Sequence, residues 1–190
     1  MEAFVGKHLS GSVLAGLAAF LLAVPAAESA LASEYPIGEP VVAAAMEVAA
    51  VFLQPVEMDP PGMMLEASQA DIHLEADIQA LAGNPHGFAE GAWVPYLQIH
   101  YELTKTGSEE RRHGHLMPMV ASDGPHYGDN VKLMGAGSYH LRLTVAPPSA
   151  DPQGHFGRHT DKETGVAPWF EPFTADYDFV FAGTGKKGSY

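Results

Sequence analysis

The chain has 190 residues, no cysteine, and 23 acidic against 10 basic side chains, which gives a formal net charge of −13. The absence of cysteine excludes disulfides, thiolate nucleophiles, zinc–thiolate sites and blue copper sites of the usual kind. The acidic balance argues against nucleic acid and anionic membranes as partners. It favours attraction of cations, although an acidic surface also serves solubility alone.

The first 32 residues have the pattern of an export signal. A polar head with Lys7 precedes an apolar run over residues 13–24, and small residues lead to a cleavage pattern that ends at Ala32. The run has about a dozen residues, whereas a membrane-spanning helix needs about 20. We therefore predict a cleaved signal peptide at 1–32 and a mature protein that does not insert into the membrane. An uncleaved N-terminal anchor is the alternative.

The rest of the chain is patterned as short strands separated by turns. Apolar and polar residues alternate, and glycine and proline separate the alternating segments. We expect strands at residues 46–54, 71–80, 93–103, 115–121, 131–134, 139–145 and 171–182, with an exposed hairpin connection at 104–112. About seven or more strands without a helical period predict an all-β, immunoglobulin-like β-sandwich over residues 33–183. A flexible tail is expected at 184–190.

A thioether and an imidazole flank a turn near the middle of the chain. Met119 and His126 lie on either side of Asp123-Gly124-Pro125, where glycine and proline can re-aim the backbone so that both side chains point at one spot. Thioether and imidazole together suit copper. From the residues alone, Met119 could instead be a methionine that fills the core.

Two further stretches offer partners for this pair. His73 and Glu75 are two residues apart in the alternating segment 71–80, so they share one face of the expected half-buried strand. His159 is the single histidine of a glycine-bounded loop at 157–165, and loops on a rigid sandwich commonly carry sites. Each histidine taken singly could also be a surface or hydrogen-bonding residue.

Other candidate ligands carry less weight. His113 and His115 flank Gly114 and could form a separate surface chelate, or simply a solvated polar turn. The methionines of the segment 58–64 could mark an entry path for metal, but packing at the core and rim is the favoured interpretation. The sequence has no nucleophile elbow, phosphate loop or His-Glu-x-x-His motif, so it does not support an enzyme.

These blocks together resemble the periplasmic iron-uptake proteins, exported copper-binding proteins that accompany a high-affinity ferrous-iron permease. The resemblance extends from about residue 35 to residue 181, and its most specific segments are 50–58, 71–78, 116–128, 156–159, 163–165 and 169–173. It implies copper ligands at His73, Met119, His126 and His159, with Glu75 as the nearby acidic ligand.

The resemblance also implies a function. It indicates a periplasmic homodimer that binds copper and iron, with Mn²⁺ as a possible surrogate for iron, and that delivers iron to an inner-membrane iron permease. A periplasmic copper chaperone or buffer without an iron role has the same ligands and is the main alternative. A ferroxidase-like redox activity and a structural sandwich domain with incidental histidines are the remaining ones.

Overall fold

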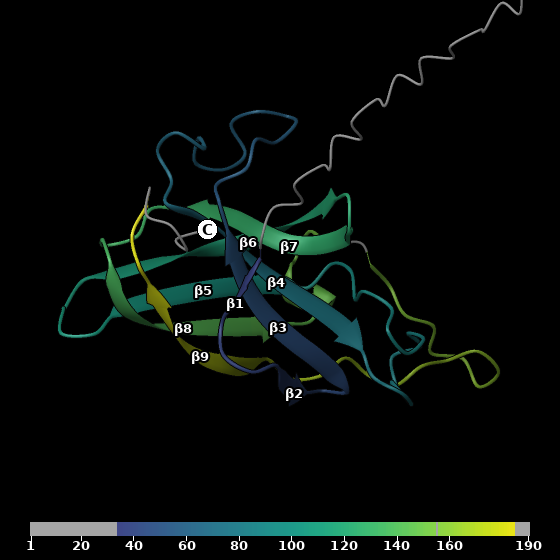
Figure 1. The fold of residues 1–190 in the computed structure, drawn as a ribbon. Helices are drawn as coiled ribbons and strands as arrows, with labels where there is room; N and C mark the ends of the chain where they lie inside the picture. The colour runs from purple at the N-terminus through teal and green to yellow at the C-terminus, as the bar shows by residue number, and fades with distance from the viewer. Residues whose placement is uncertain (1–33, 155, 185–190) are drawn as a thin grey trace, which may run out of the picture. The chain divides into compact units, whose positions relative to one another are not determined.

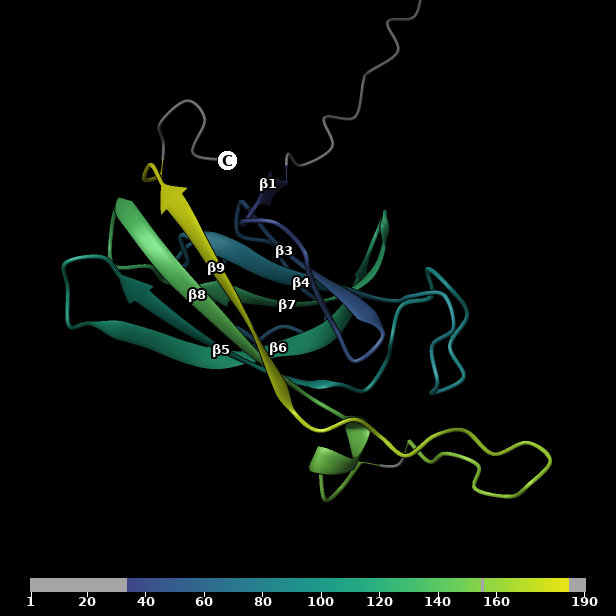
Figure 2. The ribbon, with the colours of Figure 1, turned by 90° about the horizontal axis from the view of Figure 1, so that it is seen from below.

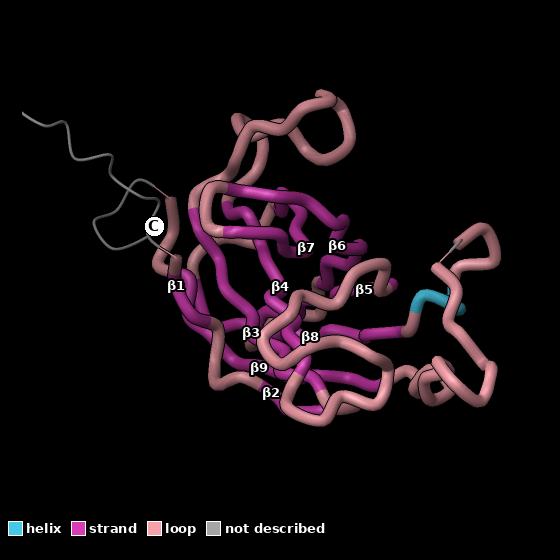
Figure 3. Tube along the Cα trace, turned by 90° about the vertical axis from the view of Figure 1, so that its right-hand side faces the viewer, coloured by secondary structure: helices cyan, strands magenta, loops and turns pink. Residues whose placement is uncertain are grey.

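The computed structural model describes residues 34–154 and 156–184; the predicted signal peptide and residues 185–190 of the predicted tail lie outside them. The strands are β1 (Tyr35–Pro36), β2 (Val41–Ala43), β3 (Met46–Leu53), β4 (Ile72–Ala80), β5 (Gln98–Lys105), β6 (Arg111–Ala121), β7 (Gly124–Val131), β8 (Gly137–Ala146) and β9 (Phe173–Phe181). In this part of the chain the only helical element is the 3-10 turn η1 (Pro148–Ala150), as Figure 3 shows. The described residues contain no helix that is long and apolar enough to cross a membrane.

The strands form one antiparallel sheet that curls into two layers. Their order is β1-β3-β4-β7-β6-β5-β8-β9, and β2 pairs with β3. Strand β6 links the layers, because its C-terminal half pairs with β7 and its N-terminal half pairs with β5. In Figures 1 and 2, β3 and β4 cross over the layer formed by β5, β8 and β9. The predicted all-β sandwich is confirmed.

Alternating apolar residues from both layers fill the space between them. On β9 every second residue from Ala175 to Phe181 is buried, and on β4 the core side is formed by residues of even number. Burial of each large apolar side chain contributes about 1.5–3 kcal/mol. The Tyr177 hydroxyl also donates a hydrogen bond to the Val48 carbonyl across the layers, at 2.8 Å. The face of β4 that carries His73 and Glu75 therefore points away from this core.

Three predicted strands differ from the observed ones. The strand predicted at 115–121 begins already at Arg111, so the connection predicted at 104–112 is shorter than expected. The strand predicted at 131–134 is wrong, because β7 occupies Gly124–Val131 and the chain then leaves the sheet. The backbone N–H of Leu133 donates instead to the Asp71 carboxylate at 2.9 Å. The strand predicted from residue 93 begins only at Gln98, since Pro95 has no N–H to donate and Tyr96 has a positive φ of 61°.

Two loops matter for the site. Residues 54–71, between β3 and β4, are held against β7 by Asn130, whose amide donates to the carbonyls of Val56 and Leu65 at 2.8 Å each. The Asn130 side-chain oxygen accepts the Val56 N–H at 3.1 Å. The loop at 156–172, by contrast, extends away from the strands in both views (Figures 1 and 2).

Candidate metal centre

Three of the predicted ligands meet on the outer face of the layer that contains β3, β4 and β7. His73 and Glu75 come from β4 and His126 from β7, and the three residues are 0%, 5% and 5% exposed. The sequence predicted a half-buried strand at 71–80, but β4 is buried on both faces over most of its length. One face packs on the core, and the other carries these polar residues in a buried cluster.

The ligand atoms lie close enough to share one ion. The Glu75 Oε1 atom is 3.5 Å from His73 Nε2 and 3.3 Å from His126 Nε2. One ligand atom from each of the three residues lies within 4.8 Å of the other two. The two imidazole rings stand nearly perpendicular, at an interplanar angle of 80°.

Asn130 fixes the tautomer of His73. Its side-chain oxygen lies 3.0 Å from His73 Nδ1 and already accepts the Val56 N–H, so its amide cannot be flipped without losing these contacts. His73 Nδ1 therefore carries the proton and donates it to Asn130. The Nε2 lone pair then points into the cluster, which is how a neighbouring oxygen orients a metal-binding histidine.

Met119 reaches the same place from β6. It stands directly opposite His126 in the β6–β7 hairpin. A Cβ atom at Gly128 would lie 2.5 Å from His73 Nε2 and 3.1 Å from the Met119 sulfur. The glycine thus leaves open the space onto which an imidazole nitrogen and a thioether converge.

These residues fit a bound copper ion. His73 Nε2 is buried and has no hydrogen-bond partner, and such orphaned polar atoms are rare unless something else satisfies them. Burial lowers the pKa of His73 to about 4, so the ring is neutral at pH 7 and able to bind metal. Burial, followed by the charge of Asp77, raises the pKa of Glu75 to about 8, a cost that a bound cation would relieve.

An acidic cavity adjoins the cluster. It has a volume of about 440 Å³, and Glu75 and His126 form part of its wall. Glu34, Asp77 and Asp123 add further carboxylates to its lining. Burial raises the pKa of Asp77, and burial together with the hydrogen bond to Asp123 raises that of Glu34. Soft and hard donors therefore lie side by side here, because carboxylate oxygens suit harder ions than thioethers do.

A second cavity, on the Met119 side, is rich in thioethers. It has a volume of about 480 Å³ and lies between the 54–71 loop and β6. Met58 and Met63 from the loop line it together with Met117 and Met119. Met63 is 52% exposed, so the thioethers extend from the surface to the candidate ligand.

His159 is the one predicted ligand that lies apart. Within the described part of the chain, the cluster of possible metal-binding side chains includes His73, Glu75 and His126 but not His159. The His159 imidazole is exposed and bonds to the Thr164 hydroxyl at 2.8 Å. It lies on the loop that extends from the sandwich.

Sequence reasoning missed several residues that shape the centre. Asn130 and Gly128 share a face of β7 with His126, so period-two spacing from that histidine could have indicated both. Asp77, two residues after Glu75 on the same face of β4, lines the cavity beside it. Glu34 directly precedes β1, and no pattern in the sequence links it to Asp123.

A family model described as "Fe2+ transport protein" matches residues 31–183. The chain belongs to this family. The family is one of iron-transport proteins and not of enzymes, and the resemblance stated from the sequence is confirmed. A UPF0423 protein of Brucella abortus is 60% identical over 169 residues, which cover 89% of this chain and 93% of the relative. The 34 kDa membrane antigen of Treponema pallidum is 41% identical over 91% of this chain and 84% of its own length.

Solved structures of similar chains include copper-bound ones. The copper-reconstituted P19 protein of Campylobacter jejuni is 54% identical, with a TM-score of 0.77 over 81% of this chain and 99% of P19. FetP of uropathogenic Escherichia coli, recombinantly expressed in the periplasm, is 51% identical, with a TM-score of 0.76 over 80% of this chain and 99% of its own. A FetP variant has also been solved with copper bound.

Proposed function

We propose that this protein is a periplasmic metal-binding component of high-affinity ferrous-iron uptake. It binds copper through His73, Met119 and His126, with Glu75 as an additional oxygen ligand. The observation that carries the proposal is the unpartnered, buried His73 Nε2 atom, which faces Glu75 and His126 next to the Met119 thioether. The copper-bound P19 and FetP structures support the choice of metal.

Iron binds at or beside the copper centre in this proposal. Glu75 belongs both to the cluster and to the acidic cavity, so it can serve an ion in either place. The carboxylates of Asp77 and Asp123 offer the oxygen donors that Fe²⁺ and its surrogate Mn²⁺ accept. Membership of an Fe²⁺ transport family supports iron as the cargo.

The proposed partners are a second copy of the chain and an inner-membrane iron permease. The expected signal peptide at 1–32 and the periplasmic expression of FetP support a periplasmic location. His159 remains a proposed ligand. Because it is exposed on an extended loop, it would have to reach the centre by loop movement or from the second protomer of a homodimer.

A periplasmic copper chaperone or buffer is the second candidate, because the His73, His126 and Met119 set alone would serve it. The two functions differ in whether the protein also carries a hard ion such as Fe²⁺ in the acidic cavity. A chaperone has no use for a carboxylate-lined cavity beside its copper ligands, whereas an iron carrier does. The cavity therefore favours the iron-uptake function.

Uptake of radiolabelled iron by cells that express the chain together with its permease tests the proposal. We expect His126→Ala to reduce iron uptake severalfold, and we expect His140→Ala, on the other layer, to leave it unchanged. Unaltered iron uptake in His126→Ala cells that have become sensitive to copper would favour the chaperone instead.

A further inference from the structure

A pair of histidines faces each other on the outer surface of the layer that contains β5, β8 and β9. His100 of β5 and His115 of β6 are directly opposed in the antiparallel register. Their ring centroids are 6.3 Å apart at an interplanar angle of 53°, and both side chains are exposed. Directly opposed residues have Cβ atoms about 4.5–5.5 Å apart, so two imidazoles at such positions can reach one ion.

A third histidine borders this pair. His113 is two residues before His115 on β6 and is exposed on the same face, opposite Glu102. The Glu102 carboxylate is already paired with the Arg111 guanidinium at 2.7 Å. His113 is therefore the better placed third donor. The ligand atoms of the three histidines do not all lie within 4.8 Å of one another, as those of the buried cluster do, so the exposed His113 side chain must rotate to join the pair.

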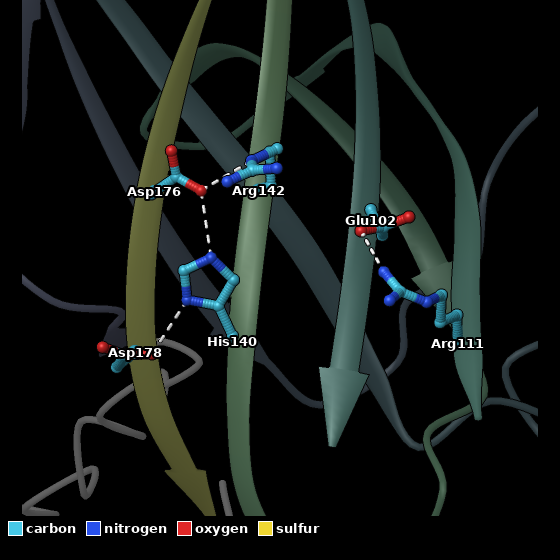
Figure 4. A network of polar contacts seen from close by, with 6 residues as sticks. All are labelled: Glu102, Arg111, His140, Arg142, Asp176 and Asp178. Atoms are coloured by element: carbon cyan, nitrogen blue, oxygen red, sulfur yellow. Dashed lines mark hydrogen bonds and ion pairs between the residues drawn. The ribbon is translucent and has the colours of Figure 1, made fainter. Parts of the chain in front are cut away.

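The two facing histidines are free of competing contacts. Across the described residues, neither His100 nor His115 has a side-chain hydrogen bond or ion pair. His140, on the same face of the same layer, lies between Asp176 and Asp178 at 3.0 and 2.9 Å (Figure 4). Both of its ring nitrogens are engaged, so His140 is a matched histidine that is not available to a metal.

We propose that His100 and His115 form a second metal site, separate from the buried centre, which chelates a borderline divalent transition ion with His113 as third ligand. Imidazole suits Cu²⁺, Zn²⁺ and Ni²⁺, and affinity within this series peaks at Cu²⁺. Ligation requires metal–nitrogen distances of about 2.0–2.1 Å, which small rotations of exposed side chains can supply. The net charge of −13 draws cations toward the surface.

The site differs in selectivity from the buried centre. It contains no thioether, so it does not favour Cu⁺, and its imidazoles bind the hard ions Mn²⁺ and Mg²⁺ weakly. Its exposure allows rapid exchange of the ion with solvent. The surface site would hold divalent ions whether or not the buried centre serves iron uptake.

Zinc titration calorimetry on the full chain without a histidine tag tests the site. His126→Ala serves as the background, because it removes a ligand of the buried centre. In this background we expect a zinc-binding event, separate from any binding in the acidic cavity, that His100→Ala or His115→Ala weakens by about tenfold or more, since each removes a ligand. His140→Ala should leave the event unchanged.

Electron paramagnetic resonance with one equivalent of Cu²⁺ in the same background provides a second readout. We expect nitrogen couplings from imidazole that are reduced in the His115→Ala chain. Equal zinc affinity in the His100→Ala, His115→Ala and parent chains would overturn the proposal. An equal loss on His140→Ala would also overturn it, because binding would then depend on the general histidine content of the surface.

Discussion

Glu75 is the residue whose protonation should change most when a metal binds. Its pKa is about 8, so at pH 7 the free carboxyl is mainly protonated, whereas His73 with a pKa of about 4 is already neutral. Because a ligand must lose its proton to bind metal, copper binding at pH 7 should release nearly one proton from Glu75 and none from His73. Calorimetry in buffers of different ionisation enthalpy measures this number.

The Glu75→Gln chain provides the control for that measurement, because glutamine has no proton to lose. We expect it to release nearly one proton fewer per copper. A raised carboxyl pKa also means that copper affinity should rise with pH below about 8 and then level off, and this dependence should be weaker in the Gln chain. Equal proton release in both chains would show that Glu75 does not bind the ion as a carboxylate.

Gly128 should tolerate no side chain if the ion lies where the ligands converge. A Cβ atom there would meet His73 Nε2 at 2.5 Å, and therefore Gly128→Ala should weaken copper binding by at least about tenfold. Gly157→Ala is the matched control, since a Cβ at that position meets nothing within 4 Å. Unchanged copper affinity in a folded Gly128→Ala chain, checked by circular dichroism, would place the ion elsewhere.

Met119 should select the oxidation state of copper. A thioether prefers Cu⁺ to Cu²⁺, so Met119→Leu should weaken Cu⁺ binding far more than Cu²⁺ binding. Leucine keeps a similar apolar volume, which limits the loss of stability to about 1.5 kcal/mol or less. Competition with chromogenic chelators for each ion measures the two affinities, and an equal loss of both would remove Met119 from its proposed role.

Among the elements, the β6–β7 hairpin and β4 carry the centre. The sequence placed His73 beside Glu75 correctly, because period-two alternation fixes which residues share a strand face. It also indicated that a turn brings Met119 towards His126, and the structure aligns the two directly. The sequence could not indicate that the polar face of β4 is buried, since the loop before β4 is held in place by long-range hydrogen bonds to Asn130 on β7.

The loop at 54–71 forms one wall of the thioether-rich cavity. Its exposed Met63 lines the thioether-rich cavity that ends at Met119, which supports the entry path that the sequence left open. We expect Met63→Leu to slow the loading of Cu⁺ severalfold in stopped-flow experiments while the equilibrium affinity stays unchanged. Val42→Leu, at another exposed apolar position, on β2, is the control. Unaltered loading kinetics in Met63→Leu would mean that the loop methionines only pack.

For the whole molecule, the pattern of strands was sufficient to predict an all-β sandwich, but it did not indicate how the layers connect. Strand β6 pairs with β5 in one half and with β7 in the other, and no local pattern marks the point of exchange. The same curl brings His100 opposite His115 on one layer and His73 near His126 on the other. Long-range register therefore decides which histidines meet.

The acidic cavity beside the proposed copper ligands is the feature of the whole molecule that favours iron uptake over copper storage. Titration calorimetry with copper and with Mn²⁺, on the full chain and on its His126→Ala and Asp123→Asn variants, separates the two functions. We predict one buried copper site that His126→Ala abolishes, and a Mn²⁺ site that Asp123→Asn weakens while copper affinity stays nearly constant. Copper binding without any affinity for Mn²⁺ or Fe²⁺ would contradict the account and favour a copper chaperone.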